Sequence, residues 1–213
     1  TENNQWFQVS NIDSLDSPAL LIYADRVKQN IQTVIENIDD IDRLRPHVKT
    51  HKSPKVCHMM LDAGIKKFKC ATIAEAEMLA GSGAADVLLA YQPIGPKVKR
   101  LADLCQEYSR TSFSCLIDNI ESASDVAKAF SRISTKIPVY IDLNVDMNRT
   151  GIDPSEAMSL FEKLQSLPGL TVAGLHVYDG HLRDPDYEAR KKKCDEAFSA
   201  VLNTKEEMSA RSG

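Results

Sequence analysis

Short apolar runs and longer amphipathic stretches alternate along almost the whole chain. The apolar runs have the length and composition of β-strands, and they lie at residues 19–23, 44–50, 67–71, 87–91, 112–117, 137–143 and 170–177. The stretches between them carry apolar positions at helical spacing. This alternation is typical of βα units that build a parallel sheet.

Helix start signals follow three of these runs. Thr72 precedes Glu75 by three residues, and the same spacing separates Asp118 from Glu121. Each pair matches the capping box, in which two side chains accept hydrogen bonds from free backbone amides. An Asp-Pro pair at 153–154 marks a further start, because proline suits the first helical turn. We therefore expect helices directly after the third, fifth and sixth runs.

The composition is that of a soluble globular domain with a small-molecule ligand. Of the 213 residues, 43% are hydrophobic and 26% are charged, which suffices for one sizeable core. The formal net charge of −4 argues against nucleic acid or an anionic membrane as a partner. No apolar run approaches the roughly 18 residues of a membrane span, and residues 1–5 lack a signal-peptide pattern, so we expect a cytoplasmic protein. The five cysteines have no CxxC spacing and indicate neither disulfides nor a zinc ribbon.

The segment 45–52, Arg-Pro-His-Val-Lys-Thr-His-Lys, has an unusual charge pattern. If the segment is extended, its Arg, both His and the first Lys project from one face. Burying such a face costs roughly 2–7 kcal/mol for each unpaired polar group, so a ligand with negative charge would have to compensate it. A lysine crowded by cations also has a lowered pKa, which is the state that a Schiff-base lysine needs. The same residues are compatible with a polar strand edge or a solvated loop.

This segment also resembles the lysine-bearing motif of a known enzyme family. It is similar to that of the D-threonine aldolase and D-serine dehydratase group, pyridoxal 5′-phosphate (PLP) enzymes with the alanine racemase fold, or fold type III. Further similar segments follow in the family's order, and they are SPALL at 17–21, CATIAEAE at 70–77, LLAY at 88–91, GPK at 95–97, NRTG at 148–151 and GLHVYDG at 174–180. Together the segments span nearly the whole chain.

The resemblance implies an α/β fold, a PLP-binding (β/α)8 barrel of the TIM type found in alanine racemase. In the family the first apolar run belongs to a separate β-domain, so residues 1–24 would form an N-terminal segment with a strand of that domain. Residues 25–213 would hold about six of the eight βα units. A complete barrel typically needs about 250 residues. We therefore expect an incomplete barrel here and a C-terminal β-domain beyond residue 213.

Lys49 is the candidate for binding the aldehyde of PLP, and Lys52 is its competitor. Parity favours Lys49, because in an extended strand it shares a face with His47, whereas Lys52 lies on the other face or in the following loop. The resemblance places the PLP lysine at the same position. We include His47, on the same face, among the residues of the cofactor site.

Arg149 is assigned by the resemblance to the phenolic oxygen of PLP. An always-charged donor keeps that oxygen anionic. Judged by residue type alone, Arg149 could instead be a solvated turn arginine.

Asp142 precedes this turn on the predicted strand. We expect its carboxylate to neutralise Arg45 inside the barrel, because a buried cation needs a paired carboxylate.

Further candidates lie at the carboxyl ends of predicted strands. The resemblance places Tyr178 against the pyridine ring of PLP, where an aromatic side chain can stack. A histidine just past a barrel strand is well placed for acid–base catalysis, which makes His181 a catalytic candidate. His176 is either a second catalytic candidate or a hydrogen-bonded core histidine. Thr72, a helix cap, and Tyr91, at the end of its run, are expected in the outer layer of the cofactor site.

The sequence therefore predicts a PLP-dependent enzyme that acts on D-amino acids, a metal-activated D-3-hydroxy amino acid lyase of the D-threonine aldolase type. Dehydration of D-serine and racemisation are alternatives, because all three reactions use the same electron sink. A PLP-carrier protein without turnover and a PLP-free barrel with a phosphate-binding strand are further alternatives. The resemblance also implies a homodimer and a divalent metal, Zn or Mn, with ligands beyond residue 213. We assign no metal ligand within the chain.

Overall fold

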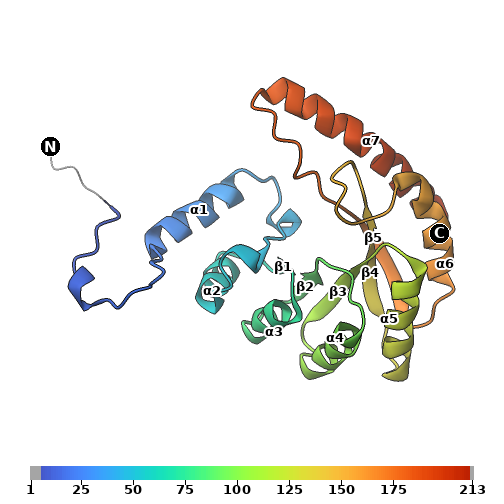
Figure 1. Ribbon diagram of the computed structural model, residues 1–213, viewed down its shortest axis with the longest axis horizontal. Helices are drawn as coiled ribbons and strands as arrows, with labels where there is room; N and C mark the ends of the chain where they lie inside the picture. The colour runs from blue at the N-terminus through green and yellow to red at the C-terminus, as the bar shows by residue number, and fades with distance from the viewer. Residues whose placement is uncertain (1–5, 212–213) are drawn as a thin grey trace.

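The computed structural model describes residues 6–211, and its centre is a parallel five-stranded sheet (Figure 1). Each strand pairs with the next one in the sequence, in the order β1-β2-β3-β4-β5. The strands are β1 (Lys67–Cys70), β2 (Asp86–Leu89), β3 (Ser112–Ile117), β4 (Ile137–Leu143) and β5 (Leu170–Val177). Five of the seven predicted strands are thus confirmed.

One α-helix connects each pair of successive strands and lies on the same side of the curved sheet, and further helices precede β1 and follow β5 (Figure 1). They are α1 (Ala24–Glu36), α2 (Pro54–Asp62), α3 (Ile73–Gly81), α4 (Pro96–Glu107), α5 (Ile120–Arg132), α6 (Ala157–Gln165) and α7 (Tyr187–Arg211). Short 3-10 helices are η1 (Ile12–Ser14), η2 (Ile41–Arg43), η3 (Val48–Thr50) and η4 (Pro154–Glu156). A helix between parallel strands is the repeating unit of an α/β barrel. Across residues 6–211, no helix is long and apolar enough to cross a lipid bilayer.

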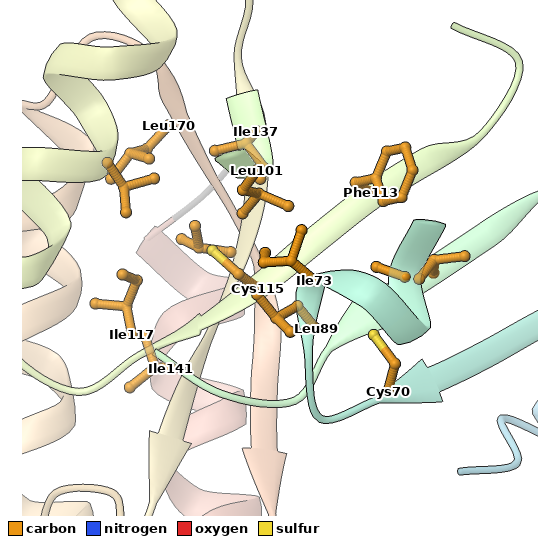
Figure 2. Close-up of a cluster of buried hydrophobic side chains, with 14 of the residues drawn as sticks. Cys70, Ile73, Leu89, Leu101, Phe113, Cys115, Ile117, Ile137, Ile141 and Leu170 are labelled. Atoms are coloured by element: carbon orange, nitrogen blue, oxygen red, sulfur yellow. The ribbon is translucent and has the colours of Figure 1, made fainter. Parts of the chain in front are cut away.

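The hydrophobic core lies between the sheet and its helices. Alternate strand residues point toward the helices, as Phe113, Cys115 and Ile117 of β3 show (Figure 2). Ile73 of α3 and Leu101 of α4 belong to the same buried cluster. Burying a large apolar side chain stabilises a fold by about 1.5–3 kcal/mol. The opposite face of the sheet is therefore available for the polar residues of the candidate site.

Two predicted strands do not form. Residues 19–23 pair with no strand in the described part of the chain. Residues 44–50 make a single bridge, between His47 and Lys69, and then turn into η3. Nδ1 of His47 accepts a hydrogen bond from the backbone amide of Lys49 at 3.2 Å, which stabilises this turn. The expectation that alternate side chains of this segment share one face is therefore wrong.

Side-chain caps begin the helices after β1 and β3. Oγ1 of Thr72 accepts a hydrogen bond from the amide of Glu75 at 3.1 Å, as the capping box predicted. After β3 the cap is Asn119, whose side-chain oxygen accepts from the amide of Ser122 at 2.8 Å. The predicted cap at Asp118 is therefore wrong by one residue. The Asp118 carboxylate is instead engaged at the carboxyl edge of the sheet.

Candidate functional site

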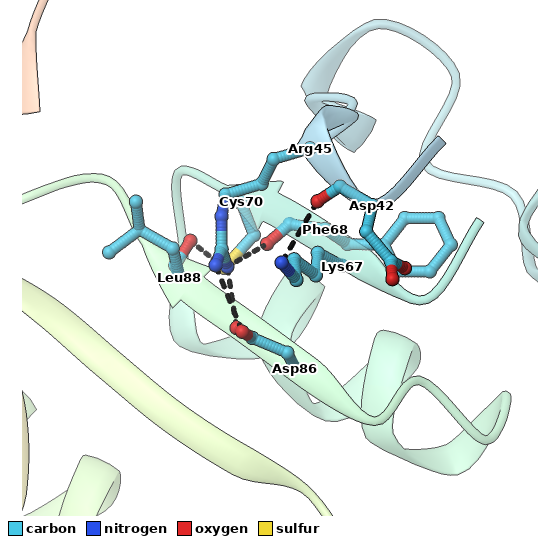
Figure 3. Close-up of polar contacts among 7 residues, drawn as sticks. All are labelled: Asp42, Arg45, Lys67, Phe68, Cys70, Asp86 and Leu88. Carbon is cyan, nitrogen blue, oxygen red and sulfur yellow. Dashed lines mark hydrogen bonds and ion pairs between the residues drawn. The ribbon is translucent and has the colours of Figure 1, made fainter. Parts of the chain in front are cut away.

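Arg45 is held beside the first strands of the sheet by an ion pair with Asp86 of β2 (Figure 3). The guanidinium donates to both carboxylate oxygens, at 2.5 Å and 2.9 Å, in a bidentate arrangement. The expected pair of Arg45 with Asp142 is therefore wrong. Asp86 lies on the strand next to β1, whereas Asp142 lies on β4, two strands further along the sheet.

Lys69 of β1 is a site residue that was not predicted. Its strand neighbours Phe68 and Cys70 are buried in the core, so Lys69 projects from the opposite face. Burial lowers the pKa of the Lys69 amine. Three cations lower this pKa further, and they are Lys49, Arg45 and Arg149. The alternation of lysine with apolar residues in the run 67–71 was the available signal.

His47 holds the backbone of Lys49 through an uncharged imidazole. Burial lowers the pKa of His47 to about 4, and the charges of Lys49 and Lys69 act in the same direction. A neutral imidazole has a lone pair to accept the Lys49 amide. Lys52 lies beyond the turn, and its ammonium is 3.6 Å from the carboxylate of Glu75. Because Lys49 has no carboxylate partner among residues 6–211, the contacts favour it over Lys52 as the reactive amine.

Asp142 of β4 and His176 of β5 form a pair on the polar face of the sheet. Nδ1 of His176 lies 2.7 Å from Oδ1 of Asp142, whose side chain is only 3% exposed. Burial alone would raise the pKa of Asp142, but hydrogen bonds from His176, Thr150 and Gln92 outweigh it and hold that pKa below its usual range. An ionised Asp142 favours a proton on Nδ1 of His176 and leaves Nε2 as an acceptor. This Nε2 is buried and has no partner in the described structure.

Gln92 connects this pair to the loop that carries Arg149. Its amide nitrogen donates to Asp142 at 3.1 Å and to Asp118 at 2.8 Å. The Asp118 carboxylate also accepts from the backbone amide of Gly151 at 3.2 Å. Gly151 has φ +93°, and a Cβ there would lie 2.8 Å from the carbonyl carbon of residue 143, so only glycine suits this position. Neither Gln92 nor Asp118 was predicted as a site residue.

Arg149 and Tyr178 meet at the carboxyl ends of β4 and β5. The guanidinium carbon of Arg149 lies 4.8 Å from the centre of the Tyr178 ring, within the range of a cation–π contact. The Tyr178 ring also lies against the backbone of Gly180, where a Cβ would come within 2.2 Å of the ring. The two predicted cofactor residues are therefore close to each other, and Gly180 leaves space for the ring.

The remaining predicted residues lie on loops at the same edge. His181 occupies a turn closed by a hydrogen bond from the amide of Leu182 to the carbonyl of Asp179 at 2.9 Å. Nδ1 of His181 is buried and has no partner in the described residues. Thr72 caps α3 and, together with the half-exposed Tyr91, lines a cavity of about 210 Å³.

These features fit an anionic, planar cofactor such as PLP. The side chains of Lys49, Lys69 and Arg149 gather without a carboxylate partner in residues 6–211. The Tyr178 ring and the free Nε2 of His176 add an aromatic surface and an acceptor. A metal site is not formed by the described residues, because they contain no group of three His, Cys, Asp or Glu that could hold an ion.

Comparison with known proteins supports the same cofactor class. The sequence profile of the alanine racemase N-terminal domain matches residues 22–212. A D-threonine aldolase from an Arthrobacter species is 27% identical over 183 residues, which cover 85% of this chain and 47% of the relative. The D-threo-3-hydroxyaspartate dehydratase of Delftia sp. strain HT23 is 28% identical over 172 residues, which cover 80% of this chain and 42% of the relative. The chain thus spans less than half the length of these two relatives.

A solved structure agrees with the sequence matches. The crystal structure of a D-threonine aldolase from Filomicrobium marinum is similar with a TM-score of 0.81 and 30% sequence identity. The matched region covers 92% of this chain and 54% of that chain. The fold is therefore of the alanine racemase type, as predicted, over the part that the chain spans.

Proposed function

The chain belongs to the family of the alanine racemase N-terminal domain, and from this premise we propose that it carries the PLP site of a D-3-hydroxy amino acid lyase. One observation carries the proposal. Lys49, Lys69 and Arg149 form a cationic group without carboxylate partners in residues 6–211, at the carboxyl edge that also holds the Asp142–His176 pair. An anionic cofactor would neutralise this group. The relatives named D-threonine aldolase support a lyase.

Several of the predicted residues would hold this cofactor. Lys49 would hold the aldehyde end of PLP through its amine, and the neutral His47 fixes the backbone that carries Lys49. Arg149 would donate to the phenolic oxygen, and Tyr178 would pack against the pyridine ring. When bound, PLP supplies the electron sink that stabilises charge developing on the substrate. Thr72 and Tyr91 line the neighbouring cavity.

Proton transfer is assigned to the histidines at the carboxyl end of β5. His181 is the general acid or base, because it lies just past the strand with a free ring nitrogen. His176 is the alternative, since its Nε2 is also free while Asp142 fixes its ring. The divalent metal, Zn or Mn, and the homodimer remain parts of the proposal that rest on the family resemblance.

A dehydratase is the second candidate, because one relative is named a D-threo-3-hydroxyaspartate dehydratase. Assays of the PLP-loaded protein with D-threonine, D-serine and D-alanine, each with and without a chelator, separate the reactions. We expect D-threonine to give glycine and acetaldehyde, with the activity lost in chelator and restored by Mn²⁺ or Zn²⁺. L-Threonine is the matched control and should not react.

Three other outcomes have defined meanings. Ammonia release from D-serine without cleavage of D-threonine would favour the dehydratase. Metal-independent interconversion of the alanine enantiomers would contradict the lyase and favour a racemase. A protein that binds PLP but converts none of these substrates would favour the carrier alternative.

A further inference from the structure

Lys69 is held rigidly near the carboxyl end of β1. Its backbone pairs with Leu88 of β2 on one side and bridges His47 on the other. The Lys69 amide also donates to the carbonyl of Pro46 at 2.8 Å. Because Phe68 fills the core face of the strand, the Lys69 side chain extends into the polar face from a fixed origin. A side chain on a strand is placed more accurately than one on a loop.

Lys69 differs from Arg45, Lys52 and Lys67 in having no ion-pair or hydrogen-bond partner for its ammonium in the described residues. Arg45 pairs with Asp86, and Lys67 donates a hydrogen bond to the carbonyl of Asp42 (Figure 3). Lys52 forms an ion pair with Glu75. In residues 6–211, the Lys69 ammonium makes no ion pair with a carboxylate. The nearby Asp142 already accepts hydrogen bonds from His176 and Gln92. A partly buried ammonium without a partner is costly, so this position is suited to an anionic ligand.

The identity of that anion follows from the other cations, on the premise of the proposed function. Lys49 would hold the cofactor aldehyde and Arg149 would donate to its phenolic oxygen, which leaves Lys69 available. The phosphate group is a less suitable partner, because barrel phosphate sites are usually built after strands seven and eight. An amino acid substrate brings its own α-carboxylate to the same edge. We propose that Lys69 binds the α-carboxylate of the substrate and thereby selects α-amino acids over simple amines.

This role can be measured with three ligands that differ only in their carboxylates. D-Alaninamide has none, D-alanine has one and D-aspartate has two. Each is titrated into the PLP-loaded wild type, Lys69→Met and Lys69→Arg, and binding is followed through the cofactor absorption band. In Lys69→Met we expect D-alanine and D-aspartate to bind about 10- to 100-fold more weakly, the range for loss of a hydrogen bond to a charged group. D-Alaninamide should bind as in the wild type, and Lys69→Arg should restore most of the affinity.

Four results would overturn the inference. An equal loss for all three ligands in Lys69→Met would mean that Lys69 has a structural role. A loss confined to D-aspartate would assign Lys69 to a side-chain carboxylate. Loss of PLP itself from Lys69→Met, with the wild type loaded, would assign Lys69 to the cofactor phosphate or aldehyde. A wild-type protein that takes up no PLP would refute the proposed function first, and this inference with it.

Discussion

Nε2 of His176 and Nδ1 of His181 are both buried without a hydrogen-bond partner in the described residues, yet the two rings are held differently. His176 is fixed by Asp142, whose other oxygen is held by Gln92. His181 lies in a turn after β5, and no carboxylate of residues 6–211 holds its ring in this way. A ring on a turn can follow the reacting atoms of a substrate. We therefore expect His181 to transfer the proton and His176 to stabilise the polar face.

Replacing each histidine separates these roles. His181→Ala should leave the cofactor absorption band unchanged and lower kcat for D-threonine cleavage by about 10²–10⁴-fold, the range for loss of a general acid or base. His176→Ala is the matched control and should retain kcat within about tenfold. Steady-state kinetics and absorption spectra measure both effects. Near-normal turnover in His181→Ala with loss in His176→Ala would place the base on the strand.

The contacts between side chains of different strands were harder to predict than the identity of the site residues. The sequence shows which residues share a face of one strand, but not which strand lies beside another. The carboxylate expected for Arg45 was therefore placed on Asp142, whereas Asp86 lies closer. Gln92 was not predicted as a site residue, because an amide side chain is rarely a catalytic group. It gains its importance only from the two carboxylates, Asp118 and Asp142, that the fold brings to it.

Strands and helices were predicted most accurately where apolar runs end in turn residues. β3, β4 and β5 have the predicted bounds, because each is an apolar run that packs under helices. The strand predicted at residues 44–50 does not form. Nδ1 of His47 accepts a hydrogen bond from the backbone amide two residues later, and this contact favours a turn over an extended strand. The loop after β4 was recognised only as a turn. The close approach of Gly151 to the end of β4 could not be predicted, because it depends on how the loop folds back onto the strand.

Gly151 and Gly83 offer a matched test of that contact. Both have a left-handed backbone, with φ +93° and +90°, but a Cβ at Gly151 would collide with the end of β4 whereas nothing lies within 4 Å at Gly83. Gly83→Ala should cost about 1–2 kcal/mol of unfolding free energy. Gly151→Ala should cost about 1–3 kcal/mol more, as expected for overpacking, and should weaken PLP binding by displacing Arg149. Urea unfolding and PLP titration measure these effects, and equal losses in the two variants would contradict the role of the contact.

The whole molecule is an α/β unit whose class was predictable from the alternation of strands and helices. The resemblance added the barrel type and the cofactor, and the family match agrees with both.

β5 is the last strand of the described sheet, and an apolar groove of about 770 Å³ lies between it and α7. The assignment of residues 1–24 to a second domain, the metal and the homodimer stay predictions. They depend on contacts outside this sheet, which local sequence patterns do not determine.

The assignment of Lys49 as the cofactor lysine is tested most directly by reductive trapping. The PLP-loaded protein should be yellow, and borohydride should remove its absorption band by reducing the bond between the cofactor and the lysine. Peptide mass mapping should then find the phosphopyridoxyl group on Lys49. Lys49→Ala should trap none, whereas Lys52→Ala should trap as much as the wild type. Label on Lys52 or Lys69, or no label on any lysine of a PLP-loaded protein, would contradict the assignment.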